Sequence, residues 1–421
     1  MIEKDASCFD DEEPGLLPVT VAQARLESKI DAIREVESVD LRSSLDRVLA
    51  RDVVSPIDVP GYRNSAMDGY AIRRTDIPSD GERNLKNLGT AWAGRPFDGE
   101  VGPGQCVRIM TGAMMPGGTD TVVIQEHVEL SGSEVRIDST VEPLRNVREA
   151  GEDVAQGETV LPQGTLLRPA QLGLLASLGV PKVDVTRRPV VAYFSTGDEL
   201  RSLDEHAGAA LGPGELFDSN RYTLFGMLSR LGVEVLDLGV VKDDKASTRD
   251  AFLRASQSAD LIVTSGGVSA GEADYVTETL RELGEVSFWK LAMRPGRPLA
   301  FGTVGDAYFF GLPGNPVAVM VTFYEFVQPA LRRLMGCSQT LTPTVPAVCQ
   351  SSLKKSPGRV EYQRGLLALV DGELQVSSTG KQGAGRLSSM SAANCLIVLP
   401  PEIERIAPGT RVEVQPFEGL V

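Results

Sequence analysis

The stretch that decides the fold is Ala259-Asp-Leu-Ile-Val-Thr-Ser-Gly-Gly-Val-Ser-Ala-Gly-Glu-Ala-Asp-Tyr275. Its apolar run Leu261-Ile-Val263 is short, rich in β-branched residues and bounded by turn-forming residues. Such a run is typical of a strand that is buried on both faces of a parallel sheet. We therefore expect a strand here, followed by a loop and a helix.

The loop after this strand has the composition of an anion-binding site. Ser265, Gly266 and Gly267 follow the apolar run directly, and Asp274 lies where the next helix is expected to begin. Because glycine has no Cβ, the loop can turn backbone N–H groups toward a phosphate, and a carboxylate beside it can hold a cation. Ser-Gly-Gly alone is better explained as an ordinary turn, but the acidic residues at the helix start favour a binding site.

Strand and helix patterns alternate on both sides of this stretch, which predicts a parallel α/β domain over residues 188–335. Ligands of such domains bind beyond the carboxyl ends of the strands. Polar residues follow five consecutive predicted strands at that position, namely Glu199, Asp243, Ser265 to Gly267, Lys290 with Arg294 and Arg297, and Pro313 with Asn315. Their repetition indicates one shared crevice.

The rest of the chain predicts three further domains. Residues 53–142 are glycine-rich with short alternating runs, which predicts an inserted β domain. Residues 16–52 and 143–187 predict one discontinuous helical linker domain, whose first helix would begin at a capping box of Thr20 and Gln23 and reach about Val36. Residues 340–421 alternate with a period of two, which predicts a C-terminal β-barrel-like domain. The expected fold class is a multidomain α/β protein.

The composition limits the class of protein. The chain has 421 residues and a formal net charge of −15, which disfavours nucleic-acid binding. Its five cysteines are widely spaced and include no Cys-x-x-Cys pair, so we expect neither a disulfide framework nor a zinc site. The sequence has no signal pattern and no apolar run near the ~20 residues that a membrane helix needs. We expect a cytoplasmic protein without a membrane segment.

The candidate residues suit phosphate chemistry. Glu199, Asp243 and Asp274 would offer the oxygen ligands that Mg²⁺ prefers when substrate phosphates share it. The basic cluster from Lys290 to Arg297 would bind substrate anions, although a solvated turn also accounts for it. The two histidines lie apart from every cysteine, so no nucleophile–histidine pair can be assembled. Covalent nucleophilic catalysis is therefore not expected.

Several longer motifs are distributed along nearly the whole chain. In the predicted α/β domain they are Ser195-Thr-Gly-Asp-Glu199, Asp218-Ser-Asn-Arg221, Thr264 to Tyr275, Phe288-Trp-Lys290 with Arg294-Pro-Gly-Arg-Pro298, and Gly311-Leu-Pro-Gly-Asn-Pro-Val317. Outside it they are Asn64-Ser-Ala-Met-Asp-Gly-Tyr-Ala71, Arg108-Ile-Met-Thr-Gly-Ala113, Gly151-Glu-Asp153 and Gln363-Arg-Gly365. Together these motifs closely resemble the MoeA family of molybdopterin molybdenumtransferases, which is related to the C-terminal part of gephyrin.

The resemblance implies an enzyme that takes adenylylated molybdopterin and molybdate and cleaves the pterin–AMP phosphoanhydride in a Mg²⁺-dependent step. It would release molybdenum cofactor and AMP. By this analogy Asp243 and Asp274 are the Mg²⁺ ligands, Glu199 assists nearby, and Ser265 to Gly267 surround a substrate phosphate. A molybdopterin adenylyltransferase and the molybdoenzymes that accept the cofactor are the implied partners.

The resemblance also assigns anion-binding and subunit roles. Molybdate and the pterin phosphate would be held by Lys290, Arg294, Arg297 and Arg364, and Pro313 and Asn315 would be further substrate-binding residues. In the homodimers that the family forms, the partner subunit's β domain would supply Asp68, Thr111 and Asp153.

This sequence departs from the family pattern at two positions. Arg294 stands where the family has a lysine, and Ala384 stands where some relatives carry serine. Arginine keeps the charge and adds bidentate donors, which leaves a changed oxyanion preference open. Two rival functions also stay open. A molybdopterin adenylyltransferase shares the α/β domain but would not need the β domains, and a gephyrin-like non-catalytic scaffold would not need the intact acidic set.

Overall fold

The computed structural model describes residues 15–206, 208, 210–267 and 275–417. They form two compact units. The first unit comprises Met1–Glu37, Asp46–Val48 and Thr186–Val421, and the second comprises Ser38–Leu45 and Leu49–Val185. The division into four domains stays a prediction.

The first unit contains a six-stranded sheet with the strand order β16-β13-β17-β21-β20-β18. The strands are β13 (Val190–Thr196), β16 (Glu234–Val241), β17 (Leu261–Ser265), β18 (Gly284–Lys290), β20 (Pro298–Val304) and β21 (Ala307–Leu312). Neighbours pair in parallel from β16 to β21, and β20 is antiparallel to both β21 and β18. Five strands therefore end at the same edge of the sheet, where the sequence placed the polar residues.

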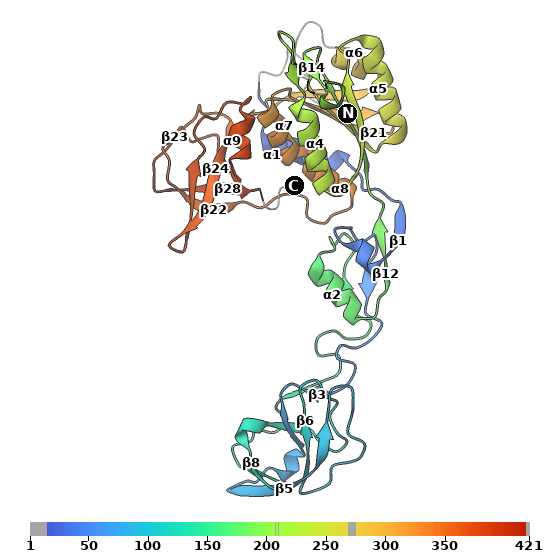
Figure 1. Ribbon diagram of the computed structural model, residues 1–421, viewed down its shortest axis with the longest axis vertical. Helices are drawn as coiled ribbons and strands as arrows, with labels where there is room; N and C mark the ends of the chain where they lie inside the picture. Colours follow the sequence, from blue (N-terminus) through green and yellow to red (C-terminus); the bar gives the residue numbers. More distant parts are fainter. Residues whose placement is uncertain (1–14, 207, 209, 268–274, 418–421) are drawn as a thin grey trace. The chain divides into compact units, whose positions relative to one another are not determined.

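Helices cover both faces of this sheet (Figure 1). Because successive side chains of a strand point to opposite faces, Tyr193 and Val263 pack into one core, whereas Phe194 and Ile262 pack into the other. The first core is closed by α1 (Val19–Lys29), α4 (Ser219–Arg230), α7 (Pro316–Thr322), the π-helical turn η4 (Phe323–Val327) and α8 (Gln328–Leu334). The second is closed by α5 (Lys245–Ser258) and α6 (Tyr275–Leu283).

The same unit ends in a small β-barrel. Strands β24 (Val360–Val370), β25 (Glu373–Ser378), β22 (Val345–Cys349), β28 (Thr410–Pro416) and β26 (Cys395–Leu399) pair in that order, and β26 pairs again with β24. This last pairing closes the barrel, as the alternating sequence pattern predicted. Strand β19 (Met293–Arg294) joins the outside of β24, and the short helix α9 (Leu387–Ser391) follows the cavity-lining segment described below.

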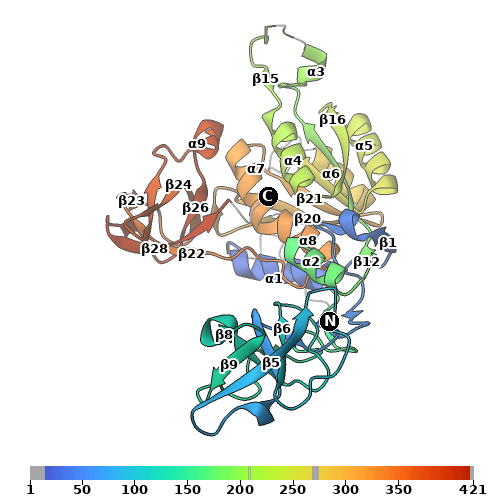
Figure 2. The same cartoon turned by 60° about the horizontal axis from the view of Figure 1, so that its bottom comes forward.

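The second unit is mostly β structure (Figure 2). Its main sheet has the order β7-β4-β6-β5-β9-β8. These strands are β4 (Gly69–Ile72), β5 (Glu82–Ala91), β6 (Gln105–Ile109), β7 (Thr121–Ile124), β8 (Glu129–Ser131) and β9 (Glu134–Asp138). Short pairs join β3 (Asn64–Ser65) to β10 (Val147–Arg148) and β2 (Val53–Val54) to β11 (Thr159–Leu161), next to helix α2 (Pro169–Ser177).

The prediction for the first helix was wrong in two respects. Helix α1 begins after Pro18 without a side-chain cap, so Thr20 and Gln23 form no capping box. The helix also ends at Lys29 rather than near Val36. The backbone beyond it bonds elsewhere, because Ile33 N donates to Leu334 O at 2.9 Å. None of the helices in the described ranges combines the length and apolar character that a bilayer crossing requires.

Candidate functional site

A cavity of about 930 Å³ lies at the edge of the sheet where the five strands end. It is lined by the glycine loop after β17, the basic turn around Pro295, the loop between β21 and α7, and a segment of the barrel. Of the predicted site residues, it brings together Glu199, Asp243, Ser265, Gly266, Gly267, Arg294, Arg297, Pro313 and Asn315. These residues come from five separate segments of the sequence, and all belong to the first unit.

The glycine loop requires its glycines. Gly266 and Gly267 both have positive φ, +91° and +68°, where a side chain is strained. A Cβ on Gly267 would lie 2.4 Å from Val276 Cγ2, so α6 packs directly against the backbone here. The N–H of Gly266 donates to Leu312 O at 3.0 Å, which joins this loop to the end of β21. The fixed, side-chain-free backbone is suited to close approach by an anion.

Acidic side chains gather on one side of the cavity. Glu199 and Asp243 line it, and Asp243 N donates to Asp198 Oδ1 at 3.4 Å. Partial burial raises the pKa of Asp243 above its ordinary 3.8, and the negative charges of Asp198, Glu199 and Asp244 raise it further. Mutual repulsion of this kind is relieved by a bound cation.

The acidic group therefore fits a Mg²⁺ ion that substrate oxygens share, because such an ion needs only one or two protein carboxylates. Within the described ranges, no three metal-ligating side chains converge on one point. Asp274, the second predicted metal ligand, lies outside the described residues.

Arginines form the opposite side. Arg294 and Arg297 line the cavity and are exposed, whereas Lys290 at the end of β18 is exposed but does not line it. Arg294 Nη1 lies 3.7 Å from Glu361 Oε2, and β19 aligns these two residues in register with β24. Glu361 is 7% exposed and accepts a bond from Gln363 Nε2 at 2.9 Å, so this carboxylate is fixed beside Arg294.

Arg364 does not reach the cavity lining. It is 1% exposed, and its guanidinium donates to Ser389 Oγ at 2.9 Å and to Gly383 O at 3.0 Å. Burial lowers the pKa of Arg364, although the neighbouring carboxylate of Glu361 opposes this effect. In this structure Arg364 orders the barrel segment that carries Ala384 into the cavity wall.

The second unit holds the other three predicted residues. Asp68 Oδ1 accepts bonds from Thr111 N and Thr111 Oγ1, both at 2.7 Å. These bonds lower the pKa of Asp68, so its carboxylate is ionised and held in one orientation. Asp153 lines a separate cavity of about 440 Å³ together with Asn64 and Arg148.

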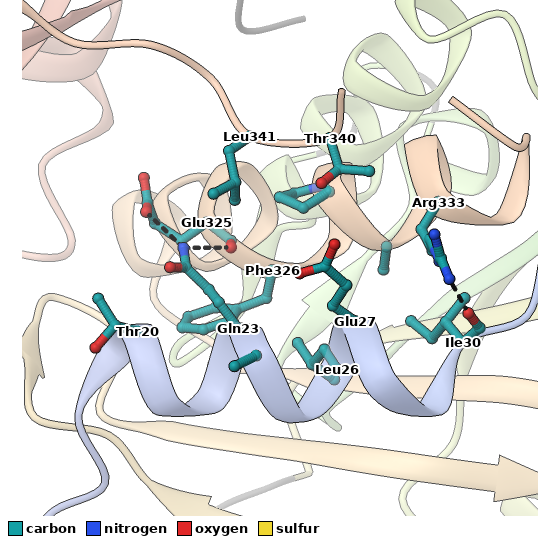
Figure 3. Close-up of a pocket in the computed structure, with 13 residues that line it drawn as sticks. Thr20, Gln23, Leu26, Glu27, Ile30, Glu325, Phe326, Arg333, Thr340 and Leu341 are labelled. Atoms are coloured by element: carbon teal, nitrogen blue, oxygen red, sulfur yellow. Dashed lines mark hydrogen bonds between the residues drawn. The ribbon is translucent and has the colours of Figure 1, made fainter. Parts of the chain in front are cut away.

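A further cavity of about 220 Å³ lies between α1 and the helical segment from η4 to α8 (Figure 3). Its walls are mostly apolar, including Leu26, Phe326 and Ala330. At one end Gln23 Nε2 donates to Glu325 O at 3.1 Å and to Glu325 Oε2 at 3.3 Å. It contains none of the predicted site residues, and its lining arginine, Arg333, donates to Ile30 O at 3.3 Å.

Sequence reasoning missed several cavity residues. Gln382 and Gly385 belong to the barrel, which no local pattern connects to the sheet edge, and Ala384 between them was named only for its departure from the family pattern. Asn220 was visible within the motif Asp218-Ser-Asn-Arg221 but received no role.

Family models match the chain in three consecutive regions. The MoeA N-terminal region (domain I and II) matches residues 17–179, a probable molybdopterin binding domain matches 192–333, and the MoeA C-terminal region (domain IV) matches 346–417. A protein from Haemophilus influenzae named molybdopterin molybdenumtransferase is 41% identical over 96% of this chain and 100% of its own length. The chain belongs to the MoeA family.

Other relatives agree with this assignment. A molybdopterin molybdenumtransferase from a Nostoc species is 40% identical over 88% of this chain and 86% of its own length. Gephyrin from Dictyostelium discoideum is 34% identical over 90% of this chain, which covers 59% of that longer protein. The crystal structure of a molybdopterin biosynthesis MoeA protein from Pyrococcus horikoshii has a TM-score of 0.82 and 30% identity, covering 95% of this chain and all of that one. The MoeA fold therefore extends over nearly the whole chain.

Proposed function

We propose that this MoeA protein is a molybdopterin molybdenumtransferase that inserts molybdate into adenylylated molybdopterin, with Mg²⁺-dependent release of AMP and formation of molybdenum cofactor. One observation carries the proposal: a single cavity unites a glycine cradle, paired carboxylates and two arginines, in a chain 41% identical to a relative with that name. These are the groups that binding and cleaving a phosphoanhydride requires.

Different parts of the cavity lining would bind different parts of the substrates. Ser265, Gly266 and Gly267 bind a substrate phosphate through the loop backbone. On the basic side, Arg294 and Arg297 bind molybdate and the pterin phosphate. Pro313 and Asn315 shape the wall between the two sides, while Lys290 and Arg364 add positive charge around the cavity.

The proposed Mg²⁺ ligands are Asp243 on the acidic side, with Glu199 near it, and Asp274, which is proposed from the sequence alone. When bound, the ion would neutralise charge on the phosphoanhydride oxygens, an effect worth several kcal/mol in such reactions. Asp243 lies on the loop after β16 and Glu199 on the loop after β13, and both line the cavity together with the glycine cradle. From these positions their carboxylates would hold the ion beside a phosphate bound in the cradle. Arg294 and Arg297 stabilise the negative charge that develops on the opposite side.

The proposal includes a homodimer in the cytoplasm. The second unit presents an ionised Asp68 fixed by Thr111, and Asp153 beside Arg148, yet these residues line no part of the large cavity. In the proposed dimer the partner subunit supplies them. A molybdopterin adenylyltransferase would provide the substrate, and molybdoenzymes would accept the product.

The test is AMP release from adenylylated molybdopterin by the purified protein, with and without Mg²⁺ and molybdate. Asp243→Asn is expected to reduce the rate at least ~100-fold, about 2.7 kcal/mol in the barrier. Asp244→Asn is the matched control. Asp244 caps α5, where it accepts bonds from Ser247 N and Oγ at 2.8 Å, and asparagine caps equally well.

The outcomes separate the assignments. If Asp243→Asn retains a near-normal rate, Asp243 is not a metal ligand. If the wild-type protein releases no AMP in response to molybdate, the transferase proposal fails and a gephyrin-like scaffold becomes the better account. If it instead forms adenylylated molybdopterin from ATP, the activity is that of an adenylyltransferase.

A further inference from the structure

The motif Asp218-Ser-Asn-Arg221 lies at the start of α4 and contains two residues with clear structural roles. Asp218 is the N-cap and accepts a bond from Arg221 N at 3.1 Å. Arg221 Nε lies 2.8 Å from both carboxylate oxygens of Asp237, which fixes α4 against β16. Neither residue lines the large cavity, whereas Asn220 between them does.

Asn220 reaches across to the loop between β21 and α7. Its Nδ2 donates to Gly314 O at 2.8 Å, and the residue is only 7% exposed. A carbonyl oxygen can only accept, so this contact fixes the orientation of the amide. Its Oδ1 is buried and has no hydrogen-bond partner among the described residues. The amide is therefore used here for its donor, not for its acceptor.

The loop that Asn220 contacts has few means of holding its own shape. Pro313 and Pro316 have no N–H to donate. The loop is attached at its two ends, where Gly266 N donates to Leu312 O at 3.0 Å and Val317 N donates to Ala384 O at 3.1 Å. Between these attachments, Asn315 O accepts the first helical bond of α7 from Val319 N at 2.9 Å, and Asn220 supplies the bond to Gly314 O from outside the loop.

We propose that Asn220 is a positioning residue, which holds the loop of Pro313 and Asn315 in place as the wall between the glycine cradle and the barrel segment. This inference rests on the proposed function, because the loop is taken to contact the substrate. It predicts that removing the donor loosens both attachments of the loop and weakens substrate binding more than turnover. If Asn220 only stabilised the fold, its replacement would lower thermal stability without loosening the loop attachments or weakening substrate binding selectively.

The test compares Asn220→Asp with Asn394→Asp. The first keeps the shape of the side chain but replaces the donor with an acceptor that faces Gly314 O. Asn394 is the control for the chemical change, because its Nδ2 also donates to a backbone carbonyl, Leu367 O, at 2.8 Å, in the barrel outside the cavity lining. Unlike Asn220 it is exposed, and its Oδ1 also accepts a bond from Leu367 N at 2.7 Å. Asn220→Ser, a milder change, serves if Asn220→Asp does not fold.

Two readouts are combined. In hydrogen–deuterium exchange, Asn220→Asp is expected to speed exchange about tenfold in peptides covering residues 261–267 and 312–319, but not in α5. In AMP release, the KM for adenylylated molybdopterin is expected to rise about tenfold, with kcat reduced less. Asn394→Asp should change neither.

Unchanged exchange in both loop peptides overturns the inference, whatever the kinetics show. Faster exchange together with a normal KM in an active wild-type background also overturns it, because the loop then does not position substrate. If the wild-type protein lacks molybdate-stimulated AMP release, the proposed function fails, and the exchange data alone decide whether Asn220 holds the loop.

Discussion

Glu325 provides a prediction whose size follows from the structure. This residue lies on the π-helical turn η4 and is 7% exposed (Figure 3). Its Oε2 accepts bonds from Tyr362 Oη at 3.0 Å and from Gln23 Nε2 at 3.3 Å. Burial raises the pKa of Glu325 from its ordinary 4.5 to about 7, although bonds from Tyr362, Gln415 and Gln23 oppose the rise. The side chain thus joins α1, the helical layer and the barrel.

The sign of the pH effect follows from proton binding. Between pH 4.5 and 7 the folded protein binds more protons at Glu325 than the unfolded chain does, so stability falls as pH rises. A pKa difference of about 2.5, at about 1.4 kcal/mol per unit, gives a total loss of about 3 kcal/mol. About 2.5 kcal/mol of this loss falls between pH 5 and pH 8.

The assay is thermal unfolding of the wild-type protein and of Glu325→Gln across that pH range. The variant cannot ionise, so relative to it the wild-type Tm is expected to fall by roughly 3–4 °C from pH 5 to pH 8, given the size of the unit that contains Glu325. Tyr362→Phe removes a bond that lowers the pKa of Glu325, so it should enlarge the loss at pH 8, but only when Glu325 is present. Parallel Tm profiles for wild type and Glu325→Gln would refute the reasoning.

Three further predictions concern stability. In metal-free buffer, Asp243→Asn should raise Tm more at pH 8 than at pH 4. The raised pKa of Asp243 means that its ionised form is unfavourable in the folded protein, and asparagine removes that charge. An equal effect on Tm at both pH values would contradict this. Gly267→Ala should cost about 1–3 kcal/mol more than Gly232→Ala in denaturant unfolding, since both have positive φ but only Gly267 lacks room for a Cβ. Asp260→Asn should cost about 2 kcal/mol at pH 7, because Asp260 accepts two bonds from Arg187 at 2.8 and 2.9 Å. The pKa of Asp260 is lowered in the fold, so the cost should begin to shrink as the pH falls below the ordinary value of 3.8, where the unfolded chain takes up the proton first, and should be lost below the lowered pKa.

The sheet was predictable because its sequence signals are local. Apolar runs such as Leu261-Ile-Val263 are too short for a helix and end in turn residues, so strand positions follow from the pattern. The end of α1 was not predictable in this way. Residues after Lys29 have charged, helix-compatible side chains, but Asp31 N donates to Tyr308 Oη at 3.0 Å and Ile33 N to Leu334 O at 2.9 Å. Contacts with distant segments replaced the helical bonds that local propensity favours.

The site was predictable only in part, for a related reason. Parallel strands place their carboxyl ends at one edge, so the sequence alone indicated that Glu199, Asp243 and the glycine loop would meet. The sequence did not indicate which arginines face the cavity, because that depends on packing between the sheet and the barrel. Arg294 lines the cavity, whereas Arg364 is buried among backbone carbonyls. Both assignments as substrate ligands stay predictions.

Ala384 stands at a position where the family resemblance implies serine in some relatives, and the structure indicates what such a change would affect. Its carbonyl oxygen accepts the bond from Val317 N at 3.1 Å, and this bond attaches the barrel segment to the start of α7. Because the contact uses the backbone, alanine preserves it as well as serine would. The neighbouring residues Gly383 and Gly385 have no side chain, and the amide of Gln382 in the same segment is bonded to the backbone N–H and carbonyl of Arg364 at 2.8 and 3.0 Å. The substitution therefore removes one donor from the cavity wall without altering the attachment of that wall, and its effect should appear in oxyanion binding and not in stability.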